Sequence, residues 1–215
     1  MNGADGGTTP GDFLDSSSTP KIVTPNNGAQ TKTDTKRFGT ASAKFDGIDD
    51  YATPPNSADL NFGTGTFTVE AWVYPTRSSS FNWDTILSTY NSSPTVGYIL
   101  SYYDNTSNIA FYDGVLWHNT GISYNLNIWQ HIAVTRSGST LRIFKNGTLV
   151  YTGTSTSNTD SPAAFSIAKS FATYNYFKGY IDEVRFSNTA RYTNNFTLPM
   201  TVQIRAINSS GAIDT

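Results

Sequence analysis

Alternation of apolar and polar residues at every second position is the feature that most limits what this chain can fold into. In FTVEAWVYP, residues 67–75, the odd-numbered positions are apolar and the even-numbered ones include Glu70 and Trp72. A period of two places successive side chains on opposite faces of a strand, whereas a helix has a period of 3.6. Both faces carry bulky residues, so we expect one to line a core and the other to be half covered.

Further segments show the same alternation and are separated by Gly, Asn, Asp, Ser and Pro. Asn146-Gly147 lies between two alternating runs, and it favours a type I′ hairpin turn because both residues tolerate positive φ. No window of twelve residues has a helical face, and only 188–194 could form a single helical turn. Besides 67–75, the expected strands are 41–47, 96–104, 108–114, 128–136, the hairpin at 140–153, 163–170 and 176–187. Strands at this spacing predict an all-β sandwich or barrel.

The strand patterns run from about residue 21 to about residue 187 without a linker-like break. We therefore expect a single domain over residues 1–200. Its first 20 residues have little to bury and should wrap the surface. Residues 201–215 are expected to be a C-terminal extension or linker, with one predicted strand at 202–207.

The composition excludes several classes of protein. Ser, Thr and Asn number 24, 31 and 19, while charged residues make up only 14% and the net charge is −2. Without a basic stripe the chain is not expected to bind nucleic acid, and without an apolar run of about 18 residues it is not expected to insert into a membrane. The absence of Cys excludes disulfides and thiolate chemistry. The first residues do not have the pattern of a secretory signal peptide.

Five motifs in sequence order resemble those of one family. They are FDGIDDY (45–51), GTFTVEAWVYP (65–75), IWQHIAVTR (128–136), LRIFKNGTLVYTG (141–153) and FKGYIDEVRF (177–186). Together they are similar to the laminin-G-like, concanavalin-A-like jelly-roll domains. The segments at 2–17 and 190–199 additionally resemble versions found in bacteriophage tail and other virion surface proteins.

This resemblance implies two antiparallel sheets, one concave and one convex, that bind glycans or proteins, often with a calcium ion. It does not by itself identify a ligand, because one fold serves many functions. The chain departs from the family at its start. Family members generally place an apolar strand before a segment like Asn2 to Gly6, whereas here Met1 comes directly before it. We expect a domain cut from a longer protein, or one whose first strand comes from elsewhere.

Aromatic residues outside the packed strands are the candidates for ligand binding. Sugars stack their apolar C–H faces on aromatic rings, while Asn, Asp and Ser side chains meet the hydroxyl groups. Trp83 and Trp117 fall in predicted loops or hairpins, where an exposed Trp without a partner is unfavourable. Trp72, in a predicted strand, is instead expected to pack within the fold. The predicted ligand-binding residues are Trp83, Tyr102, Trp117 and Tyr174.

Catalysis is not expected. Glycoside hydrolysis needs two carboxylates about 5–9.5 Å apart across the scissile bond. Related jelly-roll glucanases carry Glu-x-Asp-x-x-Glu on one strand, but the two Glu residues of this chain, Glu70 and Glu183, are far apart in sequence. Nothing in the sequence pairs Asp84 with Asp113. His131 lies in a predicted strand and is expected to pack there, since no Gly-x-Ser-x-Gly elbow accompanies it.

Calcium is the cofactor that the resemblance implies. A common site in the related fold combines an acidic side chain near the N-terminus, a backbone carbonyl before the second strand and the Asp of the final strand. By position these are Asp5, Gly39 and Asp182. The alternative is that Asp182 accepts hydrogen bonds within the protein and Asp5 belongs to a turn. A second acidic group has the spacing of a tight turn rather than of a twelve-residue calcium loop and consists of Asp46, Asp49 and Asp50.

These observations predict a non-catalytic carbohydrate-binding or adhesion module of a phage virion or other surface protein. Its partner would be a glycan or a host cell-surface receptor, and its location the virion surface or the cell exterior. One alternative is a structural decoration or fibre domain that contacts neighbouring subunits. A second is an unusual glycoside hydrolase. An open aromatic pocket would favour the first function over the structural one.

Overall fold

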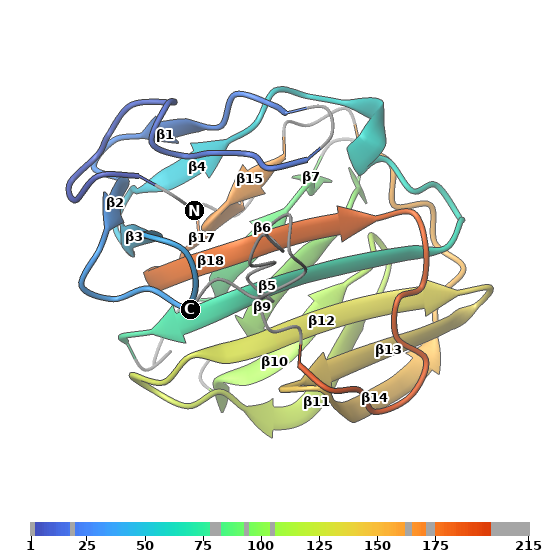
Figure 1. Cartoon of the computed structure of the whole chain (residues 1–215). Coiled ribbons are helices and arrows are strands. Elements are labelled where there is room, and N and C mark those ends of the chain that lie inside the picture. The colour runs from blue at the N-terminus through green and yellow to red at the C-terminus, as the bar shows by residue number, and fades with distance from the viewer. Residues whose placement is uncertain are drawn as a thin grey trace, which may run out of the picture.

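Two seven-stranded antiparallel sheets, here called sheet A and sheet B, pack face to face (Figure 1). The computed structural model describes residues 3–17, 20–77, 83–92, 95–103, 106–161, 165–170 and 175–198. Within these residues the helical content is limited to 3-10 conformation, in η1 (Ala58–Leu60) and at Thr106. No described helix is long and apolar enough to cross a membrane. The predicted all-β, two-sheet antiparallel sandwich is confirmed.

Sheet A has the spatial order β1-β4-β15-β6-β9-β10-β11, and sheet B has the order β14-β13-β12-β5-β18-β3-β2. The strands of sheet A are β1 (Thr24–Asn26), β4 (Tyr51–Thr53), β6 (Asp84–Ser88), β9 (Ile99–Tyr103), β10 (Asn108–Tyr112), β11 (Trp117–Ser123) and β15 (Ser166–Ile167). Those of sheet B are β2 (Gln30–Lys32), β3 (Ser42–Asp46), β5 (Phe67–Pro75), β12 (Gln130–Ser137), β13 (Thr140–Lys145), β14 (Thr148–Thr154) and β18 (Lys178–Ser187). Two small ribbons pair β7 (Asn91–Ser92) with β8 (Thr95–Val96) and β16 (Lys169–Ser170) with β17 (Asn175–Tyr176).

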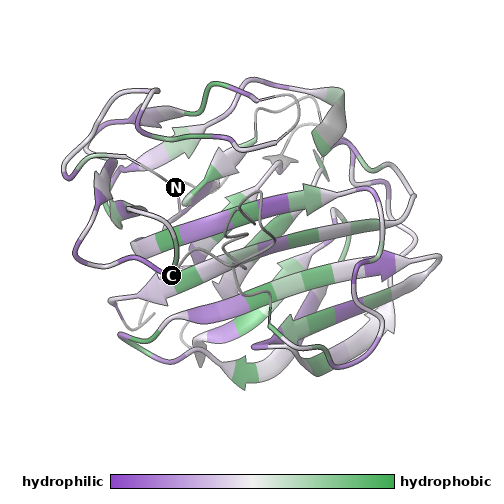
Figure 2. Cartoon of the chain, viewed as in Figure 1, coloured by the Kyte–Doolittle hydropathy of each residue, from purple (hydrophilic) through white to green (hydrophobic). Residues whose placement is uncertain are grey.

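The alternating residues of β5 divide as predicted between the core and the outer face of sheet B. Phe67, Val69 and the other odd-numbered apolar residues up to Val73 lie in the core between the sheets. Apolar and polar positions alternate along the strands in Figure 2. The outer face is more deeply covered than we expected, because Glu70 is only 1% exposed and Trp72 only 3%.

The segment after β18 covers Glu70, whereas Arg37 and Phe38 pack on Trp72. We call residues 188–198 the strap. It crosses from the end of β18 past β5 and β12 to the β13–β14 hairpin (Figure 1). Thr135 Oγ1 donates a 2.9 Å hydrogen bond to the Tyr192 carbonyl, and Phe196 N donates one of 2.9 Å to the Gly147 carbonyl. The helical turn considered for 188–194 is absent, because the polar groups of the strap bond to sheet B instead.

The N-terminal segment is tied to the sandwich more firmly than its composition indicates. Gly6 N donates to the Thr31 carbonyl at 2.8 Å, and Thr31 N donates to the Gly7 carbonyl at 2.9 Å. Phe13 is buried in the hydrophobic core. The segment therefore lies against β2 and contributes one large side chain to the core, in addition to covering the surface.

Candidate functional site

A cluster of aromatic rings lies on the face of sheet A that points away from the core. We call it the aromatic surface. Trp83 precedes β6 and lies with its ring centroid 4.2 Å from both Trp117 and Tyr103. Tyr112 is 5.1 Å from Trp117, and Tyr90 continues the row 5.2 Å from Tyr112. All five rings are partly buried, so each presents some of its surface to solvent.

Strand pairing brings these rings together from four separate segments. In the β10–β11 hairpin, Tyr112 lies directly opposite Trp117, so both side chains project from the same face. Ile99 of β9 is the partner of Tyr112 on its other side and forms the floor between the rings. Side chains opposite each other on antiparallel strands are about 4.5–5.5 Å apart at Cβ, close enough for ring contact.

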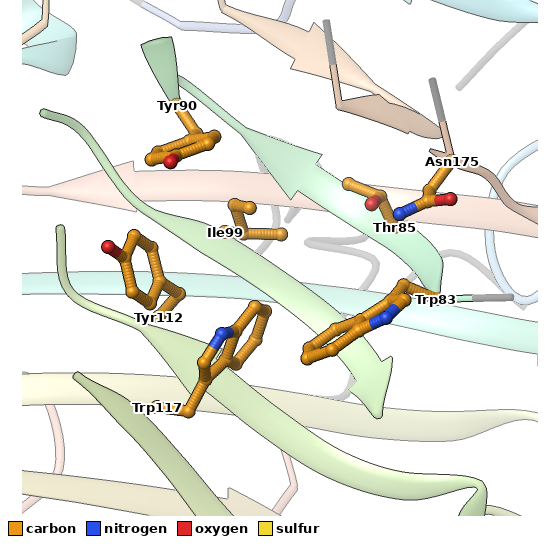
Figure 3. A pocket seen from close by; sticks show the side chains of 7 residues that line it. All are labelled: Trp83, Thr85, Tyr90, Ile99, Tyr112, Trp117 and Asn175. Atoms are coloured by element: carbon orange, nitrogen blue, oxygen red, sulfur yellow. The ribbon is translucent and has the colours of Figure 1, made fainter. Parts of the chain in front are cut away.

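The aromatic surface contains a shallow pocket of about 280 Å³. Its lining residues are Trp83, Thr85, Tyr90, Ile99, Tyr112, Trp117 and Asn175. Figure 3 shows the two Trp rings and Tyr112 along one side, with Thr85 and Asn175 side by side at the end next to Trp83. The pocket thus has an apolar, aromatic body and one polar end.

The expectation for Tyr102 requires correction. Tyr102 is 0% exposed and belongs to the core, with its ring 4.0 Å from Tyr124 and 6.2 Å from Phe177. Burial raises its pKa well above the ordinary value of Tyr. The cause is the alternation of β9, which turns Tyr102 inward and its neighbour Tyr103 outward to the Trp rings.

Two of the four predicted ligand residues, Trp83 and Trp117, lie in the aromatic surface, and Tyr174 lies outside the described residues. Trp117 is the first residue of β11 and thus lies in a hairpin, β10–β11. Sequence reasoning missed Tyr90 and Tyr112. The Asp113-Gly114 dipeptide after β10 is a hairpin signal, but a two-residue turn there would pair Tyr112 with Val115. The observed loop has four residues, 113–116, and this places Tyr112 opposite Trp117.

Asp113 shapes the turn that carries Trp117. Its Oδ1 accepts hydrogen bonds from the backbone N–H groups of Val115 at 3.0 Å and Leu116 at 2.8 Å, and its Oδ2 lies 2.9 Å from His118 Nε2. Burial alone would raise the pKa of Asp113, but the bonds from His118 and the two amides outweigh it and hold that pKa well below its usual range. The Asp113 carboxylate therefore stabilises the β10–β11 hairpin.

The other carboxylates considered for catalysis are also engaged. Asp84 is buried beside Trp83 and forms an ion pair with Arg77. Burial raises the pKa of Asp84 to about 6 in spite of this cation. Glu70 lies on sheet B, on the opposite side of the sandwich from the aromatic surface, where Arg185 and His131 contact it. None of these three groups faces a second carboxylate in the contacts among the described residues.

The predicted calcium residues make contacts with hydrogen-bond donors. Asp182 is fully buried, and its Oδ2 accepts bonds of 3.1 Å from the backbone N–H groups of Arg37 and Phe38. Its Oδ1 accepts a bond from its own neighbour, Glu183 N. Asp5 accepts from Thr33 N and lies 3.5 Å from Lys32 Nζ. Asp182 and Asp5 therefore both accept hydrogen bonds within the protein, and calcium binding by these residues stays a prediction.

Gly39, the third predicted ligand, has a positive φ of 61° in the turn that precedes β3. The acidic cluster forms the tight turn that its spacing predicts. Asp46 Oδ1 accepts from Ile48 N at 2.8 Å, and Asp50 accepts from Gly28 N at 2.7 Å and from Asp46 N at 2.9 Å. The carboxylates of Asp46 and Asp50 therefore both accept hydrogen bonds from backbone amides.

A second, larger cavity of about 880 Å³ lies beside the last half of β18. Its walls come from the N-terminal segment, including Leu14 and Val23, and from η1, β15 and residues 183–188. Apolar side chains such as Phe165 and Phe186 form part of its lining. It lacks the exposed row of rings that distinguishes the aromatic surface.

Several solved structures share this architecture at low sequence identity. Domain 4 of an extracellular GH43 arabinanase from Geobacillus stearothermophilus, in complex with arabinotriose, matches with a TM-score of 0.60 and 18% identity over 80% of this chain and 83% of its own. A putative carbohydrate-binding protein from Bacteroides ovatus matches with a TM-score of 0.53 and 18% identity, over 79% and 53% of the two chains.

A structure of botulinum neurotoxin type C, whose cell entry depends on two ganglioside molecules, matches with a TM-score of 0.60 and 13% identity. The match covers 82% of this chain and 45% of the neurotoxin chain, so this chain spans about half the length of that relative. Comparison with curated protein sequences finds no significant match. The family model of the concanavalin A-like lectin/glucanases superfamily matches residues 46–195. Because this match covers more than half of the sequence, the chain belongs to the concanavalin A-like lectin/glucanases superfamily.

Proposed function

We propose that this domain binds carbohydrate, without catalysis, at the aromatic surface of sheet A. The observation that carries the proposal is the continuous row of partly exposed rings, in which Trp83, Trp117 and Tyr112 border a pocket with a polar end. Exposed aromatic patches mark interaction sites, because their contact with water is unfavourable. Aromatic walls with a few polar groups are also typical of small-ligand sites.

The structural neighbours support this proposal, since one is seen with arabinotriose and another requires gangliosides for cell entry. The proposed absence of catalysis is supported by the contacts that the carboxylates make within the protein. Asp113 holds a turn, Asp84 pairs with Arg77, and Glu70 lies on the other sheet. An unusual glycoside hydrolase therefore remains the weaker alternative.

A glycan array followed by titration calorimetry on the best ligand tests the proposal. We expect Trp83→Ala and Trp117→Ala each to weaken binding about tenfold or more, equivalent to about 1.4 kcal/mol. Trp129→Ala is the matched control, because Trp129 is also partly buried but packs on Tyr74 of sheet B. Equal losses in all three variants, or binding unaffected by either Trp of the aromatic surface, would contradict the proposed site.

We further propose that the domain acts as an adhesion module on a virion or another extracellular surface, with a host glycan or receptor as partner. The resemblance of segments 2–17 and 190–199 to virion surface proteins supports this setting, as does the low proportion of charged residues, 14%. Immunogold labelling of particles and cells with an antibody to the domain tests the location. Labelling confined to the cell interior would contradict it.

The alternative function, contact with neighbouring protein subunits, is favoured by one feature of β18. Gly179 to Ile181 pair with β3 on one side and β5 on the other, whereas residues 185–187 pair with β5 and with no other strand of the described residues. The cavity of about 880 Å³ lies along this edge. An extended segment from another chain could pair there, as in other cases of strand addition. Slower amide exchange at 185–187 in an assembled particle than in the isolated domain would support this alternative.

Calcium binding at Asp5, Gly39 and Asp182 is also a proposal, and it rests on the family resemblance alone. The bonds of Asp182 to backbone amides account for its burial without an ion. Thermal unfolding with and without a chelator separates the two roles.

A further inference from the structure

A buried hydroxyl group lies without a partner at the polar end of the aromatic surface. Thr85 is 1% exposed, and its Oγ1 has no hydrogen-bond partner among the described residues. Buried polar side-chain atoms are nearly always hydrogen-bonded, so such an atom requires an explanation. The Thr85 side chain lines the pocket beside the Asn175 amide, close to the Trp83 ring (Figure 3).

None of the described residues that line the pocket is charged. The stretches that adjoin them in sequence, 78–82, 89–98, 103–107 and 171–176, contain neither Lys nor Arg.

Three cations flank these stretches in sequence. Lys178 is exposed and lies in β18 of sheet B, opposite Asp46 of β3. The other two, Arg77 and Lys169, have partners of their own. Arg77 binds Asp84 and the carbonyls of Gly47 and Tyr176. The Lys169 ammonium lies 4.0 Å from the centroid of the Tyr51 ring. The described lining of the pocket therefore offers an anion no cationic side chain with which to pair.

We propose that the aromatic surface selects neutral sugars and discriminates against acidic ones such as sialic or uronic acids. This inference rests on the proposed carbohydrate-binding function. One C–H face of a sugar ring stacks on Trp83 and Trp117, and a sugar hydroxyl bonds with Thr85 Oγ1 and the Asn175 amide. The ligand hydroxyl supplies the partner that the Thr85 hydroxyl lacks within the protein.

Two physical arguments support this selectivity. A carboxylate placed against aromatic rings loses its hydration without gaining a counter-ion, which is strongly unfavourable. A hydroxyl group can instead both donate and accept hydrogen bonds, and so it matches Thr85 and Asn175. The volume of about 280 Å³ is at the lower limit of ordinary ligand pockets, which suits a single sugar ring or a disaccharide.

Matched pairs of neutral and acidic glycans test the selectivity. The probes are lactose with sialyllactose, and xylobiose with its glucuronic-acid-substituted form, titrated at low and high salt. We expect a neutral member to bind at least tenfold more tightly than its acidic partner, with an affinity that salt does not change. Tighter binding of an acidic member, or binding that weakens steeply with salt, would overturn the inference but leave carbohydrate binding intact. Failure of every glycan on an array to bind would overturn the proposed function itself.

The Thr85→Val variant tests the role of the hydroxyl. Replacing a buried hydroxyl that has no partner by a methyl group is expected to leave the melting temperature unchanged or to raise it. Affinity for the neutral glycan should fall about 3- to 10-fold, which corresponds to the loss of one hydrogen bond.

Thr135→Val is the matched control. Thr135 is also buried, but its hydroxyl bonds to the Tyr192 carbonyl of the strap on the other sheet. This variant should lower the melting temperature and keep the affinity. Unchanged affinity in Thr85→Val would show that the hydroxyl does not contact the ligand and would overturn that part of the inference.

Discussion

The hydroxyl group of Tyr192 donates a 2.9 Å hydrogen bond to Oε2 of Glu70 and thereby closes the strap over the outer face of sheet B. His131 Nε2 lies 3.0 Å from the same oxygen, and Arg185 Nε donates to Oε1 at 2.5 Å. The Tyr192 ring also stacks on Phe196 with 3.5 Å between centroids. Sheet B is thus covered by the chain's own strap, and its counterpart sheet A presents the open row of rings.

We expect Tyr192→Phe to destabilise the domain by about 1.5–3 kcal/mol, the usual contribution of a hydrogen bond to a charged group. The reason is that Glu70 is nearly fully buried and loses one of its donors. Urea unfolding followed by tryptophan fluorescence measures the change. Tyr180→Phe, on the same sheet and packed on Tyr74, is the control. A similar loss in both variants would show that the hydrogen bond to Glu70 is unimportant.

Gly147→Ala should loosen the contact between the strap and the β13–β14 hairpin. Gly147 has φ of 78°, and an added Cβ would clash with the carbonyl oxygen of Phe196. Gly138→Ala is the matched control, because Gly138 has φ of 57° but nothing within 4 Å of an added Cβ. Gly138→Ala should lower the free energy of unfolding by about 1–2 kcal/mol through backbone strain alone. Gly147→Ala should lower it clearly more. Equal unfolding free energies of the two variants would contradict this account.

The stability of the domain should be greatest in mildly acidic solution. Burial raises the pKa of Asp84 to about 6, so the folded state holds this proton more tightly than the unfolded state does. The resulting stabilisation of the fold is fully present below about pH 4 and is lost as the pH rises through 6. Hydrogen bonds from His131 and Arg185 outweigh the effect of burial on Glu70 and lower its pKa, as bonds from His118 and amides do for Asp113. Those two contributions are instead lost as the pH falls below about 4.

The opposing effects place the expected maximum near pH 4.5–5, with a fall of about 2–3 kcal/mol towards pH 7 from Asp84. Urea unfolding at several pH values measures the profile. Asp84→Asn should flatten the fall between pH 5 and 7, because the Asn side chain does not titrate. An equally steep fall in the variant would assign this pH dependence to other groups.

Asp182→Asn should destabilise the domain equally in excess calcium and in excess EDTA. An Asn side chain cannot offer two acceptor oxygens to the amides of Arg37, Phe38 and Glu183, and bonds to a charged acceptor contribute about 1.5–3 kcal/mol. Thermal unfolding measures the midpoint, which shifts by about 2–4 °C per kcal/mol in a domain of this size. A wild-type midpoint that falls by about 5–11 °C in EDTA, with no such sensitivity in the variant, would support the calcium proposal instead.

The local sequence pattern was sufficient to predict most of the strands. The alternation over 67–75 coincides with β5, and Asn146-Gly147 forms the predicted turn, with φ of 51° and 78°. These features depend on side-chain periodicity and turn chemistry, which neighbouring residues determine. Family membership followed from five such motifs, and the superfamily match over 46–195 bears it out.

Only some residues of the aromatic surface could be predicted from the sequence. Trp83 and Trp117 stand out in the sequence because Trp is rare and lies beside turn residues. Their contact, and the addition of Tyr103 and Tyr112, arises because β6, β9, β10 and β11 are neighbours in sheet A. Strand order comes from pairing between distant segments, and periodicity within one segment carries no information about it.

The sequence by itself determined that this chain folds as an antiparallel sandwich of the concanavalin A-like class, because its period of two and its turn residues act locally. Tertiary structure decided which face remains open. The strap covers Glu70 on sheet B, while the strand register turns Tyr102 into the core and Tyr103 outward. A shift of one residue in register would exchange those two faces, so only long-range packing could settle the position of the binding surface.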